Sequence, residues 1–350
     1  MDSIPIILFL LVIILILFGY PVALTLGGIS VLAGLLFFDI DFFYLVSLRI
    51  YGIMNNFVLL AVPLFVFMGL TLEKSGIAER LLETMAILFG KIKGGLAYSV
   101  IIVGGMLAAS TGIVGATVVT MGLISLPTML KRGYDPKLAT GVIASSGTLG
   151  QIIPPSVVLV LLGSVLNVSV GNLFISALLP GVTLVFLYLI YVGLVTYFSP
   201  KAAPAMPTKM IEEFKEKTSL INIFNAFLLP FILIFAVLGS IFLGIASPTE
   251  AAGIGAAGAI LLSLIQGSMN IKKLKQISSE TTKLTSIVFM ILLGATSFSL
   301  VFRGLEGDRI LIDMITSSTV SYTHLRAHET REDLVCRRLL EKKNGGGGGG

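Results

Sequence analysis

The stretch "ASSGTLGQIIPPS", residues 144–156, interrupts a chain otherwise dominated by Leu, Ile, Val and Phe. Two adjacent prolines, Pro154 and Pro155, lack the N–H groups that would bond carbonyls about four residues upstream, near Gly150 and Gln151. A helix centre inside a membrane offers no water to replace such bonds. We therefore expect residues 137–167 to form one crossing helix that is unwound at its centre.

The composition places the chain among polytopic membrane proteins. Of its 350 residues, 55% are hydrophobic and 12% are charged, and its mean hydropathy is +1.00. Apolar runs long enough to span or partly span a bilayer recur along it, without the alternation of a β-barrel. The fold class we predict is all-α, and the first run, from Ile4, reads as a retained span and not a signal peptide. The expected apolar segments are 4–20, 22–38, 57–72, 94–109, 115–130, 137–149, 154–167, 172–198, 220–245, 249–268 and 284–302.

Two short segments within 94–130 predict a re-entrant hairpin, because positive residues flank both of its ends. With that hairpin, the segments divide the basic residues unequally between the two sides of the membrane. One side holds only Arg49, Arg303 and Arg309; the other holds Lys74, Arg80, Lys91, Lys93, Lys131, Arg132, Lys137, Lys201, Lys209, Lys215, Lys217, Lys272, Lys273, Lys275 and Lys283. The positive-inside rule makes the richer side cytoplasmic and the N-terminus external. The amphipathic segment 76–92 is expected to lie in the cytoplasmic interface as an arm helix.

A weak internal repeat relates the two halves of the chain. "FGYPVALTLGG" (18–28) matches "LGIASPTEAAGIGAAG" (243–258), and "FVFMGLTLEKSGIAERL" (65–81) matches "VFMILLGATSFSLVFRGLEGDRI" (288–310). An odd number of crossings in the first unit predicts inverted repeats, as in secondary transporters. We expect a first repeat over 1–198, a cytoplasmic linker over 199–219 and an incomplete second repeat over 220–319.

The last residues, 320–350, change abruptly to a charged tail that ends in six glycines. They resemble translated sequencing-adapter sequence and are predicted to be foreign, the alternative being a native disordered tail. Both histidines and the single cysteine lie there, so the preceding chain offers no His or Cys for a metal site or a nucleophile. We expect neither an enzyme nor a cofactor. Glu250 in "SPTE" is expected to belong to a capping box with Ser247, with a direct role in the transport path as the alternative.

Sodium binding requires about five or six oxygens, which unwound carbonyls and hydroxyls can supply without a buried carboxylate. Two stretches offer them, the hairpin tip "AASTGIVGA" (108–116) and the opening stretch. The candidate ion and substrate residues are Ser110, Thr111, Gly112, Gly115, Ser145, Ser146, Gly147, Thr148, Gly150, Ile153, Pro154, Pro155 and Ser156. A half-helix starting at Pro155 would direct its positive end at a substrate carboxylate. The simpler alternative is that these glycines and prolines only kink and pack helices.

At these residues the sequence resembles the large membrane subunit of tripartite ATP-independent periplasmic (TRAP) transporters. The resemblance covers residues 4–318 and rests on "AVPLFVFMGLTLEKSGIAERL", on "SPTEAAGIG" and on the block "GGLAYSVIIVGGMLAASTGIVGATVVTMGLISLPTMLKRGYDPKLATGVIASSGTLGQIIPPSVVLVLLG". "ASTGIVGA" followed by "GTLGQIIPPS" is most similar to the mannitol or chloroaromatic branch. The family continues through a second hairpin and a second unwound "TPP" stretch, which this chain lacks, so we expect no transport by the chain as written.

The resemblance implies an elevator-type, sodium-coupled importer of small organic acids in the bacterial inner membrane. Its implied partners are a small four-helix membrane subunit and a periplasmic binding protein that delivers the substrate; no nucleic acid is expected. It also implies a sodium site formed by Ser110, Thr111, Gly147, Gly150 and Ile153. The main alternative is another inverted-repeat sodium or carboxylate carrier without a binding protein. A channel or an intramembrane enzyme fits less well, because the chain shows neither rings of charge nor a catalytic constellation.

Overall fold

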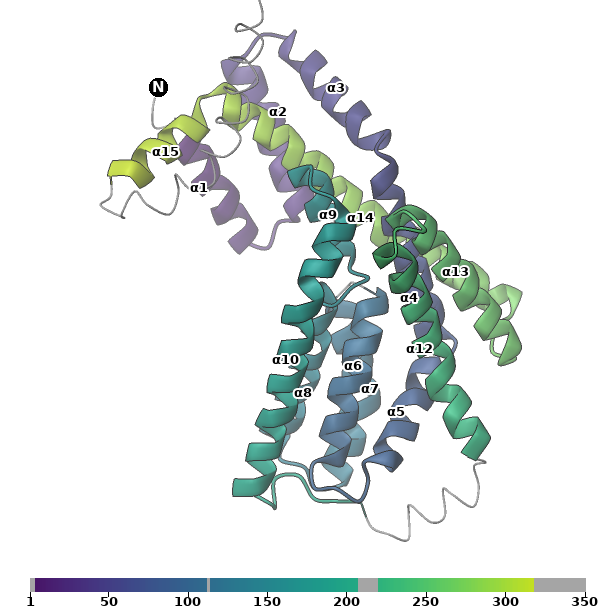
Figure 1. Cartoon of the computed structure of the whole chain (residues 1–350). Helices are drawn as coiled ribbons and strands as arrows, with labels where there is room; N and C mark the ends of the chain where they lie inside the picture. Colours follow the sequence, from purple (N-terminus) through teal and green to yellow (C-terminus); the bar gives the residue numbers. More distant parts are fainter. Residues whose placement is uncertain (1–3, 112–113, 207–219, 318–350) are drawn as a thin grey trace, which may run out of the picture. The chain divides into compact units, whose positions relative to one another are not determined.

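The computed structural model describes residues 4–111, 114–206 and 220–317, and within these ranges it is helical, without a strand (Figure 1). The described part holds α1 (Ile4–Leu17), α2 (Val22–Phe37), α3 (Phe42–Met54), η1 (Phe57–Leu60), α4 (Ala61–Lys74), α5 (Ile77–Leu88), α6 (Gly95–Thr111), α7 (Val114–Lys131), α8 (Pro136–Thr148), η2 (Leu149–Gln151), α9 (Val157–Leu166), α10 (Val170–Phe198), α12 (Leu220–Phe242), α13 (Pro248–Ile265), α14 (Ile271–Gly304) and α15 (Gly307–Ser317). The all-α prediction is confirmed.

The apolar segments expected from the sequence all lie on helices, but three helical regions were missed. α3 and α15 were read as connections, and α14 begins at Ile271 instead of near residue 284. The missed start of α14 contains several lysines and a glutamate, which a hydropathy criterion rejects although Lys and Glu are good helix formers. Hydropathy therefore located the apolar part of that helix and not its length.

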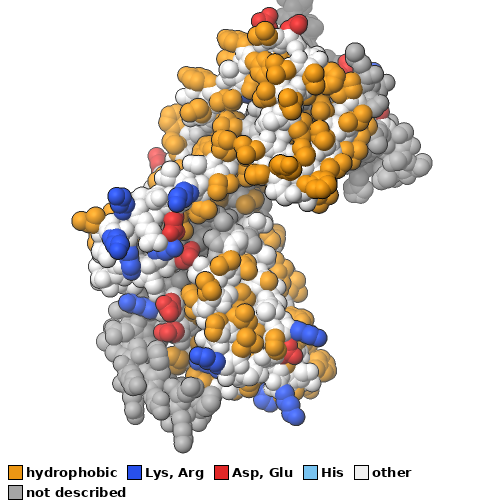
Figure 2. All heavy atoms as spheres, turned by 180° about the vertical axis from the view of Figure 1, so that it is seen from behind, with side chains coloured by type: hydrophobic (Ala, Val, Ile, Leu, Met, Phe, Trp, Pro, Cys, Tyr) orange, Lys and Arg blue, Asp and Glu red, His pale blue; other side chains and the backbone are white. Residues whose placement is uncertain are grey.

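Among the described residues, four helical stretches are long and apolar enough to cross a membrane, namely 57–74, 170–198, 248–265 and 271–304, and several shorter helices are also apolar. Large hydrophobic side chains lie exposed on them; Leu17 and Leu179, for example, are 80% and 76% exposed. Figure 2 shows hydrophobic side chains covering broad areas of the face in view, with charged side chains gathered in a few places. Such a surface is stable in lipid and not in water, which identifies a multi-pass membrane protein.

The chain divides into two compact units. One comprises residues up to Tyr51 and those from Met290 onward; its described part contains α1, α2, most of α3, the end of α14 and α15. In it, Gly294 of α14 packs against α2, where a side chain at this position would meet the carbonyl oxygen of Ala23 at 2.7 Å. The other unit, Gly52–Phe289, contains α4 to α13 and the start of α14. The two units are defined by which residues pack together in space. They therefore do not test the predicted division of the sequence into two repeats.

The unit Gly52–Phe289 has two hydrophobic cores. The first lies among α5, α6, α7 and α8, with Val192 of α10 and Ala203 also buried in it. The second lies among α4, α9, α12 and α13, with Ile277 of α14 fully buried. Figure 1 shows α6, α7, α8 and α10 side by side below the short helix α9. The interrupted α8–η2–α9 stretch therefore connects the two cores.

Two helix connections matched by the proposed repeat have the same local form. α4 joins α5 through Ser75 and Gly76, and α14 joins α15 through Leu305 and Glu306. The second residue of each connection is left-handed, with φ of 76° at Gly76 and 59° at Glu306. A non-glycine residue adopts this conformation only at some cost, so its presence at Glu306 indicates that the turn geometry is required. The assignment of inverted repeats nevertheless stays a prediction.

Candidate functional site

Regular helix is interrupted within residues 137–167, while the membrane crossing of this stretch stays a prediction. α8 ends at Thr148, a 3-10 turn follows over Leu149–Gln151, and regular helix resumes only at Val157. The expected start at Pro155 was wrong by two residues. Ser156 is extended, with φ of −115°, and its Oγ accepts the backbone N–H of Leu159 at 3.4 Å as an N-cap. Capping by Ser156, and not the fixed φ of proline, therefore decides where α9 begins.

The prolines leave nearby carbonyl oxygens without the N–H donors of a continuous helix, and these oxygens differ in the hydrogen bonds that they accept instead. The Gln151 oxygen, expected to be open to an ion, accepts a 2.8 Å hydrogen bond from the Ser156 hydroxyl. The Leu149 oxygen accepts from the backbone N–H groups of Ile152 and Ile153 at 3.0 and 2.8 Å. Gly150 loses its α-helical partner because Pro154 has no N–H. The carbonyl of Gly150 is thus a better ion-ligand candidate than that of Gln151.

The candidate hydroxyls of α8 donate their protons locally. Ser146 is fully buried and donates to the carbonyl oxygen of Ile143 at 3.0 Å, while Thr148 is exposed and donates to that of Ser145 at 2.7 Å. A hydroxyl that donates its proton to a carbonyl keeps oxygen lone pairs for a cation. Among these candidate hydroxyls, Ser146 and Ser156 are buried and Thr148 is exposed.

The start of α6 and the end of α7 lie together, while a re-entrant hairpin over 94–130 stays a prediction. The backbone N–H of Leu96, in the first turn of α6, donates to the Tyr134 hydroxyl at 3.2 Å, just beyond α7. The segment after α10 joins both, because Gly94 donates to Ala203 at 3.0 Å and Asp135 donates to Ala202 at 2.8 Å. The two ends of the hairpin therefore share one end of this unit with the end of α10.

The hairpin packs directly on the candidate stretch. A side chain at Gly104 of α6 would lie 2.6 Å from Ser146 Oγ, and one at Gly147 of α8 would overlap Cγ2 of Val118 of α7. Small residues thus let these helices approach closely, as is common in membranes. α6 and α7 thus pack against α8 at Gly104 and Gly147, whereas the predicted meeting of the hairpin tip with the unwound stretch stays a prediction.

The tip of the hairpin is only partly described. Gly112 lies outside the described residues, and the side chains of Ser110 and Thr111 are likewise outside what the structure describes. Gly115 is exposed and has no neighbour within 4 Å of the position its side chain would occupy. One sodium ion shared by the tip and the unwound stretch therefore stays a prediction.

The unwound stretch also contacts α10, which the sequence analysis did not foresee. A side chain at Gly181 would lie 2.9 Å from Cγ1 of Ile153, and Pro180 stands beside this glycine inside α10. Pro154 and Pro155 are both buried. The "PG" pair in the middle of a long apolar segment was the sequence signal for this contact.

Two acidic residues of the membrane helices have defined roles. Glu250 and Ser247 form the expected capping box at the start of α13, with Ser247 N–H donating to Glu250 Oε2 at 2.7 Å. Glu73 was missed because the expected span ended at residue 72, whereas α4 continues to Lys74. The Thr120 hydroxyl of α7 donates to Glu73 Oε1 at 2.7 Å, which links α4 to the hairpin.

Comparison with known proteins decides the family. Residues 9–325 match the family described as tripartite ATP-independent periplasmic transporter, DctM component. The chain belongs to this family. The match extends past residue 320, where foreign sequence was expected, so the assignment of the tail stays a prediction. The family consists of transporter permeases.

Several curated relatives are TRAP transporter large permeases. The chain is 30% identical over 273 residues to the C4-dicarboxylate permease DctM of Pseudomonas aeruginosa, covering 78% of this chain and 62% of that protein. It is 30% identical to the sialic acid permease SiaM of Vibrio cholerae, covering 75% and 60%, and 30% identical to the ectoine permease TeaC of Halomonas elongata, covering 73% and 58%. This TRAP permease chain thus spans about three fifths of the length of these relatives.

Proposed function

We propose that the chain is the membrane permease part of a sodium-coupled secondary importer of small organic acids or related solutes. The observation that carries this proposal is the unwound stretch 149–156, packed by small residues against a hairpin that begins and ends on one side. Broken helices that meet near the bilayer midplane are typical of substrate and ion sites in such carriers. Family membership supports transport but leaves the coupling ion open.

The oxygens proposed for sodium are those that this geometry leaves most suitable. The carbonyl of Gly150 lacks its helical partner, the Ser146 and Ser156 oxygens are buried, and the carbonyl of Ile153 lies in the non-helical segment. Ser110 and Thr111 remain proposed ligands from the hairpin tip. α9 begins at Val157, and the positive end of its dipole would favour a substrate carboxylate.

The proposed partners are a small four-helix membrane subunit and a periplasmic binding protein that selects the substrate. The named relatives support organic solutes in general, because their printed names include C4-dicarboxylate, sialic acid and ectoine. The mannitol or chloroaromatic branch stays untested. We further propose the bacterial inner membrane as the location, with a periplasmic N-terminus, on the distribution of basic residues.

Sodium binding can be tested on the chain itself. Purified protein in detergent is heated in sodium chloride or in potassium chloride at equal ionic strength. A specific sodium site raises the unfolding temperature in sodium alone and in a concentration-dependent way. The Ser146→Ala variant should reduce this difference, whereas Thr183→Ala, on the exposed side of α10, should not. Equal unfolding temperatures in both salts would remove the sodium proposal.

Transport itself requires reconstitution with both proposed partners in liposomes. Uptake that needs the binding protein supports the tripartite reading. Uptake of the same rate without it would favour the alternative, an inverted-repeat carboxylate carrier that works alone. Uptake driven equally well by a proton gradient in the absence of sodium would contradict the coupling ion.

A further inference from the structure

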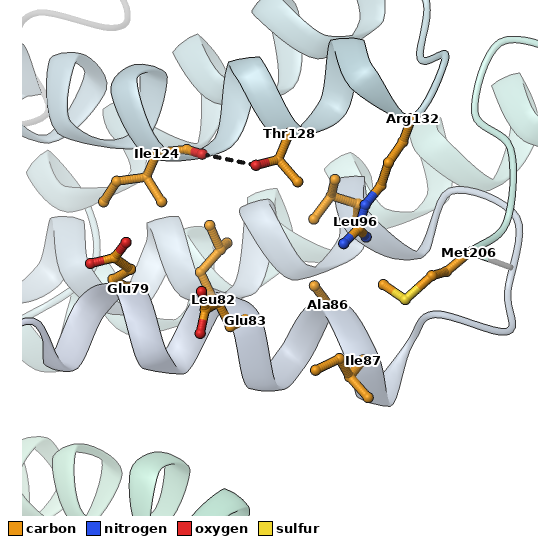
Figure 3. A pocket seen from close by; sticks show the side chains of 10 residues that line it. All are labelled: Glu79, Leu82, Glu83, Ala86, Ile87, Leu96, Ile124, Thr128, Arg132 and Met206. Atoms are coloured by element: carbon orange, nitrogen blue, oxygen red, sulfur yellow. Dashed lines mark hydrogen bonds between the residues drawn. The ribbon is translucent and has the colours of Figure 1, made fainter. Parts of the chain in front are cut away.

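A cavity of about 310 Å³ lies between α5 and α7 (Figure 3). It is separate from the unwound stretch 149–156, none of whose residues line it. Part of its wall is apolar, and its charged side chains are Glu79 and Glu83 from α5 and Arg132 from just beyond α7. A volume of roughly 300 Å³ is within the range of small-molecule sites. The proposed transport mechanism gives this cavity no role.

The charges of opposite sign stand at different places along the cavity. Figure 3 shows the two glutamates toward the start of α5 and the guanidinium of Arg132 toward the end of that helix, beside Leu96. Glu79 and Glu83 are four residues apart, as are Thr128 and Arg132 on the facing side, and four residues of helix correspond to about 6 Å. A ligand that bridges the cavity therefore meets negative charge at one end and positive charge at the other.

These charges are free to bind a ligand. None of the three forms an ion pair within the part of the chain that the structure describes. Arg132 is half-buried, and burial lowers its pKa, so a phosphate or carboxylate beside it would relieve the cost of holding the charged guanidinium there. Between the two ends, the Thr128 hydroxyl donates to the carbonyl oxygen of Ile124 at 3.3 Å and keeps lone pairs for a donor.

The surroundings of the cavity favour an amphiphilic ligand. Leu82, Ala86 and Ile87 of α5 line it with apolar groups. Large apolar side chains are also exposed on both helices; Leu88 of α5 is 67% exposed and Leu123 of α7 is 74% exposed. In a membrane protein such side chains face lipid. The ligand that matches this combination has an apolar part, a negative group for the guanidinium and a positive group for the carboxylates.

We propose that the cavity binds the headgroup of a phosphatidylethanolamine lipid, with the phosphate on Arg132 and the ammonium on Glu83 and Glu79. The headgroup carries these two charges only two carbons apart, which is comparable to one helical turn of about 5 Å. A primary ammonium has three N–H donors, and the two carboxylates and the Thr128 oxygen offer three acceptors. The site needs neither sodium nor substrate and goes beyond the proposed function.

Other lipid classes match the same charges less well. Phosphatidylglycerol has the phosphate but no ammonium, so its net negative charge would lie near Glu79 and Glu83 without compensation. Phosphatidylcholine has both charges, but its trimethylated nitrogen carries no N–H to donate to a carboxylate. The selectivity expected of the cavity is therefore for phosphatidylethanolamine over both.

Fluorescence quenching tests this selectivity, because the chain has no tryptophan of its own. Leu88→Trp places a reporter on α5 next to Ile87, and Leu179→Trp places a control reporter at an exposed position of α10. The full chain is reconstituted in phosphatidylcholine vesicles that contain one lipid with brominated, and therefore quenching, acyl chains. At Leu88→Trp, we expect brominated phosphatidylethanolamine to bind at least about tenfold more tightly than brominated phosphatidylcholine or phosphatidylglycerol of the same chain length. At Leu179→Trp, the three lipids should quench equally.

Charge variants in the Leu88→Trp background identify the binding groups. Arg132→Gln should abolish the preference, Arg132→Lys should keep part of it, and Lys131→Gln, an exposed charge that does not line the cavity, should leave it unchanged. Glu79→Gln combined with Glu83→Lys makes the cavity cationic and should transfer the preference to phosphatidylglycerol. A variant that gains a new lipid preference has not simply unfolded.

Each remaining outcome contradicts the proposal. Equal quenching by all three lipids at Leu88→Trp would mean non-selective contact with the bilayer. A preference of the parent for phosphatidylglycerol would mean that general basic charge attracts lipid to this end of the unit. A phosphatidylethanolamine preference that survives Arg132→Gln unchanged would place the lipid elsewhere. Because no transport is measured, these results are independent of whether sodium-coupled uptake is found.

Discussion

The hydroxyl of Ser156 donates a 2.8 Å hydrogen bond to the carbonyl oxygen of Gln151, where the missing N–H of Pro155 would have bonded in a continuous helix. The same oxygen of Ser156 caps α9 by accepting from Leu159 N–H. The Ser156 side chain therefore makes one hydrogen bond on each side of the interruption. The interruption is a structured element and not a frayed helix, which is what a binding site requires.

Replacing Ser156 should destabilise the protein. Ser156→Ala removes the cap and leaves the Gln151 carbonyl without its partner, at an expected cost of about 1–2 kcal/mol. The measurement is unfolding in detergent, with Thr183→Ala as a control that removes only an exposed bond within α10. Ser156→Thr keeps the hydroxyl and should recover most of the loss. Equal stability of the Ala variant and the parent would contradict the bridging role.

The close approach of α8 and α7 should make Gly147 intolerant of a side chain. Gly147→Ala would overlap Val118, and we expect a loss of about 1–3 kcal/mol from overpacking. Gly141→Ala is the matched control on the same helix, because nothing lies within 4 Å of its position, and it should be neutral or stabilising by about 0.5–1 kcal/mol. Adding Val118→Ala should recover part of the Gly147→Ala loss. Two glycine variants of equal stability would argue against the contact.

Tyr134 should contribute a stability that declines at alkaline pH. Burial raises the pKa of its hydroxyl above the ordinary value of 10.0, so the folded state holds this proton more tightly than the unfolded chain. By linkage, its contribution is complete below pH 10 and is lost as the pH rises through the folded-state pKa. Unfolding of the parent should therefore become easier from about pH 10 upward.

The variant Tyr134→Phe isolates this effect. It leaves the buried N–H of Leu96 without an acceptor and should cost about 1–3 kcal/mol at neutral pH. It should also flatten the alkaline decline, which unfolding measured from pH 8 to pH 11 would show. An identical alkaline slope in both proteins would mean that another group causes it.

Glu250 should act through its hydrogen bond and not through its charge. Glu250→Gln keeps an acceptor for Ser247 N–H and should preserve sodium-dependent stabilisation and uptake, whereas Glu250→Ala should lower the unfolding temperature by loosening the start of α13. If Glu250→Gln abolishes uptake while the protein remains folded, the carboxylate has a direct part in the transport path.

Residues 144–156 show how far local chemistry could be predicted. Two prolines in a membrane helix leave carbonyls without partners, so the break was foreseeable. Which carbonyl stays open was not, because the Ser156 hydroxyl reaches back five residues only in the folded geometry. The capping box at Ser247 was predictable, because it joins Ser247 only to Glu250, which lies within the same turn of helix.

Glu73 and Arg132 mark the limit of sequence reasoning about the hairpin. Each stands at the end of an apolar segment, where charged residues usually meet water, and nothing in the sequence joins α4 and α5 to α7. Helix packing brings Glu73 to Thr120 and places Arg132 on a cavity wall that it shares with Glu79 and Glu83.

The sequence by itself determined the membrane class, the break in the helix after Thr148 and the family, because each depends on hydropathy, proline chemistry or a contiguous motif. Only the tertiary structure decided the partners of the freed carbonyls, the length of α14 and the contact of Glu73 with Thr120. The reason is physical. Hydropathy and capping act within about one turn of helix, whereas contacts between helices depend on which faces pack together.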